Sequence, residues 1–206
     1  AATLKQQIQR LKLFFEIDKT DIVIFYDGVN DMTKAFQKNK NNKMQKTHII
    51  NFQAIFQKFR NFALGRYLME RSTKSTKSNV KNFVIESEEY CKLLIETNRF
   101  IKNQGALFYH FLEPNLYAKS PLNKYEKEDL VPFLRFYAPD MELILKKSAP
   151  IFSACSKNLT FSTNLNLAFN EIENSPFLDF VHLNESGNKI IADRIYEKLL
   201  IDKVFE

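Results

Sequence analysis

Two short apolar runs constrain the fold of this 206-residue chain more than any other feature of its sequence. They occupy residues 21–26 (DIVIFY) and 106–111 (ALFYHF) and are rich in β-branched and aromatic side chains. A run with so few polar side chains is typical of a strand covered on both faces, as in a parallel sheet. A third, weaker strand is predicted within residues 158–166 (NLTFSTNLN).

Helical patterns lie on either side of these runs. Leu4, Ile8, Leu11 and Phe15 recur at the spacing of one helix face, which predicts a helix over residues 3–15. Further helices are predicted at residues 80–103, at 124–147 with breaks near Pro132 and Pro139, and at 185–200. Helices that alternate with short apolar strands predict an α/β fold with a parallel sheet, as one domain over residues 1–206.

Composition excludes several other classes of protein. Apolar residues make up 45% of the chain, too much for a disordered protein, and 4 Gly and 2 Cys exclude a collagen-like or disulfide-rich protein. No run approaches the ~18 apolar residues that a membrane-spanning helix needs. We expect Cys91 and Cys155 to be free or buried thiols, and the sequence does not indicate a cellular compartment.

One segment carries the positive charge of the chain. Residues 34–81 contain twelve Lys and Arg but a single acid, Glu70, so their net charge is +11 against +6 for the whole protein. The remainder is therefore net −5. About eighty residues separate the two strands, whereas a parallel crossover needs roughly a dozen, so we interpret residues 34–81 as a basic insertion within the domain.

The insertion is predicted to contain one helix between two linkers. Residues 39–46 and 72–78 have the composition of linkers, and residues 48–69 show an apolar helix face. This helix either lies over the core with a solvated basic face or is an interfacial helix that meets an anionic lipid or an acidic polymer. Nucleic acid is a weaker candidate partner, because no nucleic-acid-binding motif accompanies the charge.

Two segments are predicted to meet at the carboxyl ends of the strands, where open α/β sheets bind ligands. The first is Gly28-Val-Asn30-Asp31, directly after the first strand, and the second is Asp179-Phe-Val-His182, before the last helix. An Asp three residues before a His can hold the imidazole in one tautomer and stabilise the imidazolium that forms when His acts as a base. The Asn30 amide can donate a hydrogen bond to a developing oxyanion.

Structural roles would also explain these residues. Asn30 or Asp31 could cap the helix that follows, and His182 could be a structural residue ahead of a helix start. The other two histidines, His48 and His110, have no such setting, and His110 is predicted to be a packed core residue.

The two segments resemble conserved blocks of the GDSL/SGNH hydrolases. Residues 21–31 (DIVIFYDGVND) contain the Gly-x-Asn-Asp core of the family's third block, and residues 179–192 (DFVHLNESGNKIIA) resemble its fifth block, Asp-x-x-His before a helix start. Residues 111–117 (FLEPNLY) are similar to the strand and loop after the fourth strand of bacterial members. The matches follow the family's order and span nearly the whole chain.

The resemblance implies a three-layer, flavodoxin-like fold and a hydrolase with a Ser-His-Asp mechanism. It implies that His182 is the catalytic base, that Asp179 orients it, and that Asn30 is the side-chain donor of the oxyanion hole, in a loop that turns at Gly28. In this mechanism Ser attacks an ester carbonyl and the acyl-enzyme is then hydrolysed, without a metal or a cofactor.

The chain also departs from the family pattern. It contains no Gly-Asp-Ser, so the nucleophilic serine is missing, and so is the second-block Gly whose backbone N–H also serves the oxyanion hole. We therefore expect the chain to begin just after the second block and to lack two strands that would pair beside residues 21–26. That strand should then have an unpaired apolar edge, which is prone to aggregation.

Two functions from different classes are consistent with these residues. The first is the C-terminal portion of an acyl or acetyl esterase or a lipase-like enzyme, which acts on a glycan or lipid ester when intact and is inactive as the chain stands. The second is a non-catalytic relative that binds an anionic glycan or a membrane surface through residues 34–81. A nuclease-like phosphoester enzyme ranks last, because the sequence shows no cluster of metal ligands.

Overall fold

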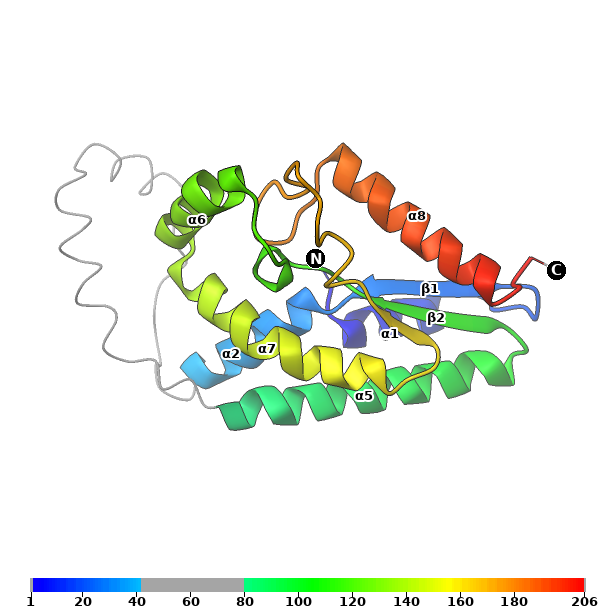
Figure 1. The fold of residues 1–206 in the computed structure, drawn as a ribbon. Coiled ribbons are helices and arrows are strands. Elements are labelled where there is room, and N and C mark those ends of the chain that lie inside the picture. The colour runs from blue at the N-terminus through cyan, green and yellow to red at the C-terminus, as the bar shows by residue number, and fades with distance from the viewer. Residues whose placement is uncertain (1, 42–79, 206) are drawn as a thin grey trace.

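The computed structural model describes residues 2–41 and 80–205, in which three parallel strands are covered by helices on both faces (Figure 1). The strands are β1 (Ile22–Asp27), β2 (Leu107–Leu112) and β3 (Ser162–Asn164), in the order β1-β2-β3. The helices are α1 (Leu4–Phe14), α2 (Val29–Asn41), α5 (Val80–Asn103), α6 (Val131–Tyr137), α7 (Pro139–Lys157) and α8 (Glu185–Ile201), with shorter turns at Leu116–Ala118 and Glu126–Leu130. The predicted α/β class with a parallel sheet is confirmed.

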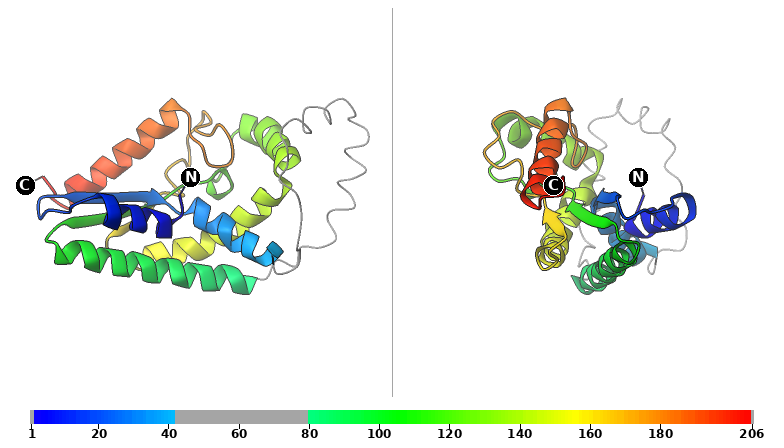
Figure 2. Two further views of the ribbon diagram at one scale, coloured as in Figure 1. Left: turned by 180° about the vertical axis from the view of Figure 1, so that it is seen from behind. Right: turned by 90° about the vertical axis from the view of Figure 1, so that its right-hand side faces the viewer.

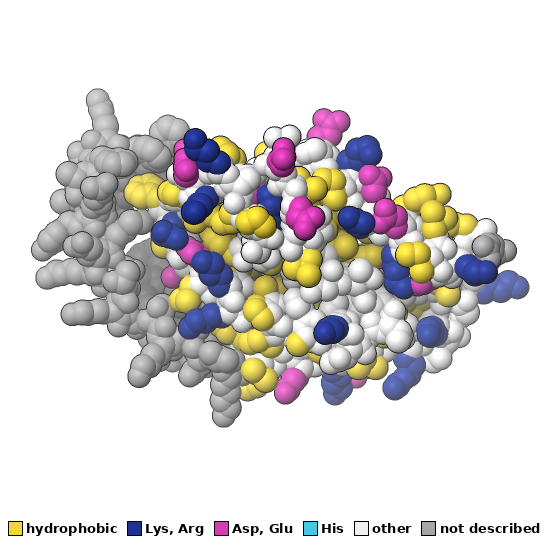
Figure 3. Space-filling view, in the orientation of Figure 1, with side chains coloured by type: hydrophobic (Ala, Val, Ile, Leu, Met, Phe, Trp, Pro, Cys, Tyr) yellow, Lys and Arg dark blue, Asp and Glu magenta, His cyan; other side chains and the backbone are white. Residues whose placement is uncertain are grey.

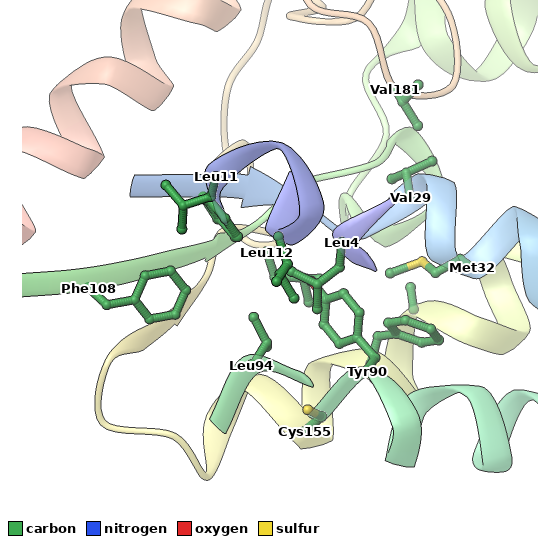
Figure 4. Close-up of a cluster of buried hydrophobic side chains, with 14 of the residues drawn as sticks. Leu4, Leu11, Val29, Met32, Tyr90, Leu94, Phe108, Leu112, Cys155 and Val181 are labelled. Carbon is green, nitrogen blue, oxygen red and sulfur yellow. The ribbon is translucent and has the colours of Figure 1, made fainter. Parts of the chain in front are cut away.

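Alternate side chains of β2 divide the core into two layers. In the end-on view of Figure 2, α8 lies on one side of the sheet and α5 and α7 lie on the other. Phe108 and Leu112 pack in the cluster formed with α1, α5 and α7, which Figure 4 shows in close-up. Tyr109 and Phe111 pack in the cluster that includes α8. β2 is therefore the central, buried strand that its apolar sequence predicts.

In the described part of the chain, β1 is an edge strand. It pairs only with β2, from Ile22 opposite Leu107 to Asp27 opposite Leu112. Ile24 is 40% exposed, so the expectation that this strand is buried on both faces is wrong. The expected unpaired edge is confirmed within the described residues.

An open pocket runs along this free edge. Its volume is ≈ 490 Å³, and it lies between β1 and α1 with the turn that follows α1. Beside it, Leu13 and Phe14 at the end of α1 are exposed, and so is Phe15 directly after the helix, although the sequence pattern placed Phe15 on the buried face. An extended segment in this pocket would therefore find backbone partners on β1 and apolar side chains on α1.

The proline-containing region differs in part from its sequence pattern. Pro132 lies in the first turn of α6, and Pro139 is the first residue of α7. Pro139 is tolerated there because the N–H that it lacks would have no partner inside the helix, whereas Pro132 lies where the Glu126–Leu130 turn runs directly into α6. The expected end of the helix at residue 147 is wrong, since α7 continues through Pro150 to Lys157.

Most of the predicted basic insertion lies outside the described residues. This part comprises residues 42–79 and includes the helix expected at residues 48–69. The predicted helix at residues 80–103 coincides with α5. On the face seen in Figure 3, acidic and basic side chains of the described residues are interspersed among apolar ones.

A disulfide joins the two long helices that pack on the same face of the sheet. Cys91 of α5 is bonded to Cys155 of α7, with their Cα atoms 5.9 Å apart. The expectation of free thiols is therefore wrong. The two residues are 64 positions apart, so only the packing of α5 against α7 brings them together.

A buried ion pair holds the loop between β2 and α6. The Lys119 Nζ donates to both carboxylate oxygens of Glu126, at 2.8 and 2.7 Å, and to the Ile172 carbonyl at 3.1 Å. The Asn123 backbone N–H also donates to Glu126, at 2.9 Å. Because buried charges are tolerated only when such bonds satisfy them, the pair fixes the course of this loop.

We expect loss of the disulfide to lower the free energy of unfolding by roughly 3–4 kcal/mol, because a crosslink over a long loop restricts the unfolded chain. Urea unfolding of the protein with and without reductant measures the effect. The double variant Cys91→Ser, Cys155→Ser is the control and should not respond to reductant. Alkylation of both cysteines in the native, unreduced protein would contradict the bridge.

We expect Lys119→Met to cost about 3–5 kcal/mol of stability, because it leaves the Glu126 carboxylate buried without a cation. Replacing both partners, with Lys119→Met and Glu126→Gln, should recover much of the loss. Lys189→Met is the matched control, since Lys189 forms an exposed pair with Asp193 and should change stability by less than about 1 kcal/mol. Equal effects of the two lysine variants in urea unfolding would contradict this expectation.

Candidate active site

The two candidate segments lie together at the carboxyl end of the sheet. Val29 and Val181, each directly before a candidate side chain, belong to the same core cluster (Figure 4). The Leu116 backbone N–H donates to the Phe180 carbonyl at 2.9 Å and ties the loop after β2 to the second segment. Both segments therefore lie at the carboxyl end of the sheet, and their direct contact stays a prediction.

A tight hairpin presents His182 to solvent. Phe177 and Leu183 form an antiparallel bridge at its base. The Asp179 Oδ1 accepts the backbone N–H groups of Val181 and His182, each at 2.8 Å. Asp is suited to this place because its short side chain reaches backbone N–H groups two and three residues further along. The carboxylate thus closes the turn that carries the histidine.

The same carboxylate holds the imidazole. The Asp179 Oδ2 lies 2.7 Å from the His182 Nδ1, so the contact predicted from the Asp-x-x-His spacing is confirmed. A proton on Nδ1 leaves Nε2 as an acceptor in the neutral ring. The His182 side chain is 72% exposed, and its Nε2 has no hydrogen-bond partner among the described residues. A hydroxyl group that approaches from solvent can therefore give its proton to this nitrogen.

Hydrogen bonding keeps Asp179 ionised at neutral pH. Burial by itself would raise the pKa of this carboxyl group. The backbone N–H of Val181, together with the side chain and backbone N–H of His182, outweighs burial and lowers the pKa below its usual value. An ionised Asp179 is the form that stabilises an imidazolium during proton transfer.

The start of α8 supports the hairpin from behind. The Asn184 Oδ1 accepts the Gly187 N–H at 2.9 Å, and the Asn184 Nδ2 donates to the Ser175 carbonyl at 2.7 Å. Gly187 is required by close packing, since a Cβ there would lie 2.7 Å from the Pro176 carbonyl oxygen. Asn184 caps α8, so His182 is not needed for the helix start.

Gly28 makes the sharp turn between β1 and α2. Its φ of 131° is unfavourable for any residue with a side chain. A Cβ at this position would also collide with the Leu112 side chain at the end of β2. The loop that carries Asn30 therefore lies directly against the second strand.

The side chains of Asn30 and Asp31 reach α1. The Asn30 Nδ2 donates to the Ala2 carbonyl at 3.3 Å, and the Asp31 Oδ2 accepts the Leu4 N–H at 2.9 Å. Asp31 therefore hydrogen-bonds to the first turn of α1. The sequence had also allowed Asp31 to cap the helix that follows β1, and the structure does not show that role. An amide NH₂ has two N–H donors, so Asn30 retains one for another acceptor.

Three carboxyl groups lie beneath this loop, and sequence reasoning missed two of them, Asp27 and Glu113. Burial, together with the charge of Asp27, raises the pKa of Asp31 to about 6 and the pKa of Glu113 to about 7. A backbone N–H, from Leu4 or Val29 respectively, opposes each shift. Their positions were the available clue, since Asp27 ends β1 and Glu113 directly follows β2.

A buried polar chain runs below the site from β1 to β3. The Tyr90 hydroxyl lies 2.5 Å from the Asp27 Oδ1 and 2.8 Å from the His110 Nε2. The His110 Nδ1 lies 2.6 Å from the Ser162 Oγ, which is 2.6 Å from the Ser156 Oγ. When Asp27 is a carboxylate it only accepts, so Tyr90 donates to it and accepts the His110 Nε2–H. His110 is fully buried, as predicted for a core residue.

No group of three or more His, Cys, Asp or Glu in the described part of the chain is arranged to hold a metal ion. No helix here is long and apolar enough to cross a bilayer.

Comparison with known proteins found no relative. The chain matched no protein-family model, no curated protein and no solved structure. A function for the chain is therefore inferred from its own residues and from the geometry of the site.

We expect Asp31→Asn to stabilise the protein at pH 8 and to have little effect at pH 4. The pKa of Asp31 is about 6 in the folded protein against a usual value of 3.8, so folding favours its protonated form. This contribution to stability is present below pH ~4 and is lost as the pH rises through ~6. Urea unfolding at pH 8 should show a gain of about 1–3 kcal/mol.

Asp193→Asn, on the exposed face of α8, is the control for this experiment and should change stability little at either pH. A loss of stability in Asp31→Asn that is the same at pH 4 and pH 8 would mean that charge burial does not govern this position.

Proposed function

We propose that this chain carries the His-Asp part of the active site of a GDSL/SGNH-type ester hydrolase. The observation that carries the proposal is the 2.7 Å contact between the Asp179 Oδ2 and the His182 Nδ1, on a hairpin that packs beside the Gly28–Asp31 loop. Acyl transfer needs a base with this orientation and a free Nε2, and it needs a hydrogen-bond donor for the oxyanion.

The order of the strands supports a flavodoxin-like sheet. In such sheets the order is 2-1-3-4-5, so strands three to five are neighbours and strand one pairs beside strand three. The order β1-β2-β3 is compatible with the last three of these strands. The free edge of β1 is then the place where a further parallel strand would pair.

The start of α1 supports the same arrangement. Asn30 binds the Ala2 carbonyl and Asp31 binds the Leu4 N–H, so the chain that enters α1 passes next to the proposed oxyanion donor. A backbone N–H just before α1 would be well placed to act with the Asn30 amide, as the glycine of the family's second block does.

The proposed reaction has two stages. A serine Oγ attacks the ester carbonyl while the His182 Nε2 takes its proton, and the Asn30 amide donates to the oxyanion. His182 then returns the proton to the departing alcohol, and Asp179 stabilises the imidazolium between these events. Water attacks the acyl-enzyme by the same route, which releases the acid and restores the serine. The serine would lie on a strand that pairs with the free edge of β1.

We expect the chain extended by the coding sequence upstream of Ala1 to hydrolyse p-nitrophenyl acetate, and the 206-residue chain alone to show no activity above background. In the extended protein, His182→Ala and Asp179→Asn should each lower kcat by about 10³–10⁴-fold, because the base or its orientation is lost. Asp193→Asn is the control and should retain full activity.

Two outcomes would count against the proposal. If the upstream reading frame encodes no serine near a strand end, the proposed nucleophile does not exist. If activity survives His182→Ala, His182 is not the catalytic base. Salt-sensitive binding to anionic vesicles that requires residues 34–81, without hydrolysis, would instead favour a non-catalytic relative.

A further inference from the structure

The Tyr90 hydroxyl lies at the turn from which the loop of Asn30 starts. It donates to the Asp27 Oδ1 at 2.5 Å, and Asp27 is the last residue of β1. A Cβ on Gly28, the next residue, would lie 3.6 Å from the same hydroxyl oxygen. Tyr90 therefore lies beside both residues of the turn, although it belongs to α5 and is 63 positions away from Asp27 in the chain.

Asp27 depends on this hydroxyl for its place. Among the described residues, its buried carboxyl group receives one hydrogen bond, from Tyr90 to Oδ1, and Oδ2 receives none. Burial, followed by the charge of Asp27, raises the pKa of Tyr90 well above its usual value, so the phenol keeps the proton that it donates. A buried acceptor that loses its last donor is costly, so removal of the hydroxyl would favour any movement that brings Asp27 to water.

The hydrogen bonds behind Tyr90 can all be directed toward Asp27. With Asp27 ionised, Tyr90 donates to it and accepts the His110 Nε2–H. The His110 Nδ1 then carries no proton and accepts from the Ser162 hydroxyl at 2.6 Å. The Ser162 oxygen accepts in turn from Ser156, also at 2.6 Å. Each group donates once, so a single arrangement of protons satisfies the chain from α7 to β1.

The fold holds this chain from both sides of the helix pair. The Cys91–Cys155 disulfide joins the residues that directly follow Tyr90 and directly precede Ser156. The Tyr90 ring also packs against Phe152 of α7, with the ring centroids 5.0 Å apart, within the cluster of Figure 4. The hydroxyl group is therefore presented to the turn by a crosslinked and buried pair of helices.

We propose that Tyr90 is a positioning residue of the candidate site, which fixes the turn at Asp27 and Gly28 through this hydrogen-bonded chain and thereby holds the loop that carries Asn30. The inference rests on the proposed function and deepens it, since it assigns the placement of the oxyanion donor to a residue outside both candidate segments. The effect on catalysis should be large, because a displacement of about 1 Å can lower a rate about 100-fold.

The direction of the chain is tested in the wild-type 206-residue protein by ¹⁵N NMR of the histidine rings at pH 8. His110 should carry its proton on Nε2 and none on Nδ1, and this Nε2–H should exchange slowly because the ring is fully buried. His182 is the comparison and should show the opposite tautomer, since its Nδ1 faces Asp179. A proton on the His110 Nδ1 would overturn the chain and the proposal with it, and the measurement needs no variant.

The positioning role is tested by amide hydrogen exchange in Tyr90→Phe, which removes the hydroxyl and keeps the ring. Two amides report on the two ends of the β1–β2 pair: the Glu113 N–H donates to the Asp27 carbonyl at 2.8 Å, and the Leu107 N–H donates to the Asp21 carbonyl at 3.0 Å. Exchange of the Glu113 amide should rise about tenfold more than that of the Leu107 amide. Equal changes at both ends in a folded protein would mean a general loss of stability and would overturn the role.

Tyr109→Phe is the matched control, because Tyr109 is also buried but packs on the other face of β2. It should not change the ratio of the two exchange rates. In the active, extended protein, Tyr90→Phe should lower kcat about tenfold or more with little change in KM, whereas Tyr109→Phe should retain kcat. Full kcat in Tyr90→Phe would overturn the positioning role.

These measurements separate the failure of this inference from the failure of the proposed function. If the extended wild-type protein does not hydrolyse the ester, the proposed function fails, and the His110 tautomer and the Glu113 amide still decide whether Tyr90 holds the turn. If the extended protein is active and Tyr90→Phe is equally active, only the positioning role fails.

Discussion

The hydrogen bond from the Glu113 N–H to the Asp27 carbonyl ends the pairing of β1 with β2 and determines what lies at the carboxyl end of the sheet. Beyond it the two chains diverge, one through Gly28 into α2 and the other through the loop that binds Phe180. Every group of the candidate site is placed by one of these two paths. A shift in strand register would separate the loop of Asn30 from the hairpin of His182, because both depend on where this last pair falls.

The site collects more negative than positive charge, and its hydrogen bonds show how the fold tolerates this. Tyr90 donates to Asp27 and Leu4 donates to Asp31, so each of these two carboxyl groups is met by a neutral donor, and the backbone N–H of Val29 lowers the pKa of Glu113. Neutral donors offset burial only in part, which is why the pKa values of Asp31 and Glu113 remain raised. Asp179 differs because three hydrogen bonds, one of them to an imidazole, lower its pKa. Two kinds of carboxyl group therefore occur at this end of the sheet.

The parts of this arrangement that sequence reasoning predicted are local ones. The contact of Asp179 with His182 forms within a segment of four residues. The apolar sequence of β2 is enough by itself to predict that this strand is buried. The missed parts join segments that lie far apart in the chain. Tyr90 is 63 residues from Asp27, and the cysteine pair spans 64. The exposure of Ile24 was missed for a related reason, since a strand's sequence indicates that it suits a covered sheet but not whether a neighbour covers it.

The free edge of β1 and the free Nε2 of His182 are two incomplete features of the described part of the chain. The edge offers unpaired backbone groups and an apolar pocket against α1. The imidazole offers an oriented acceptor that nothing in the described chain uses. A parallel strand beside β1 would end level with Asp27, so the residue after its end would emerge next to Gly28 and face the hairpin. Under the proposed function, one added strand would both cover this edge and bring a side chain to the base.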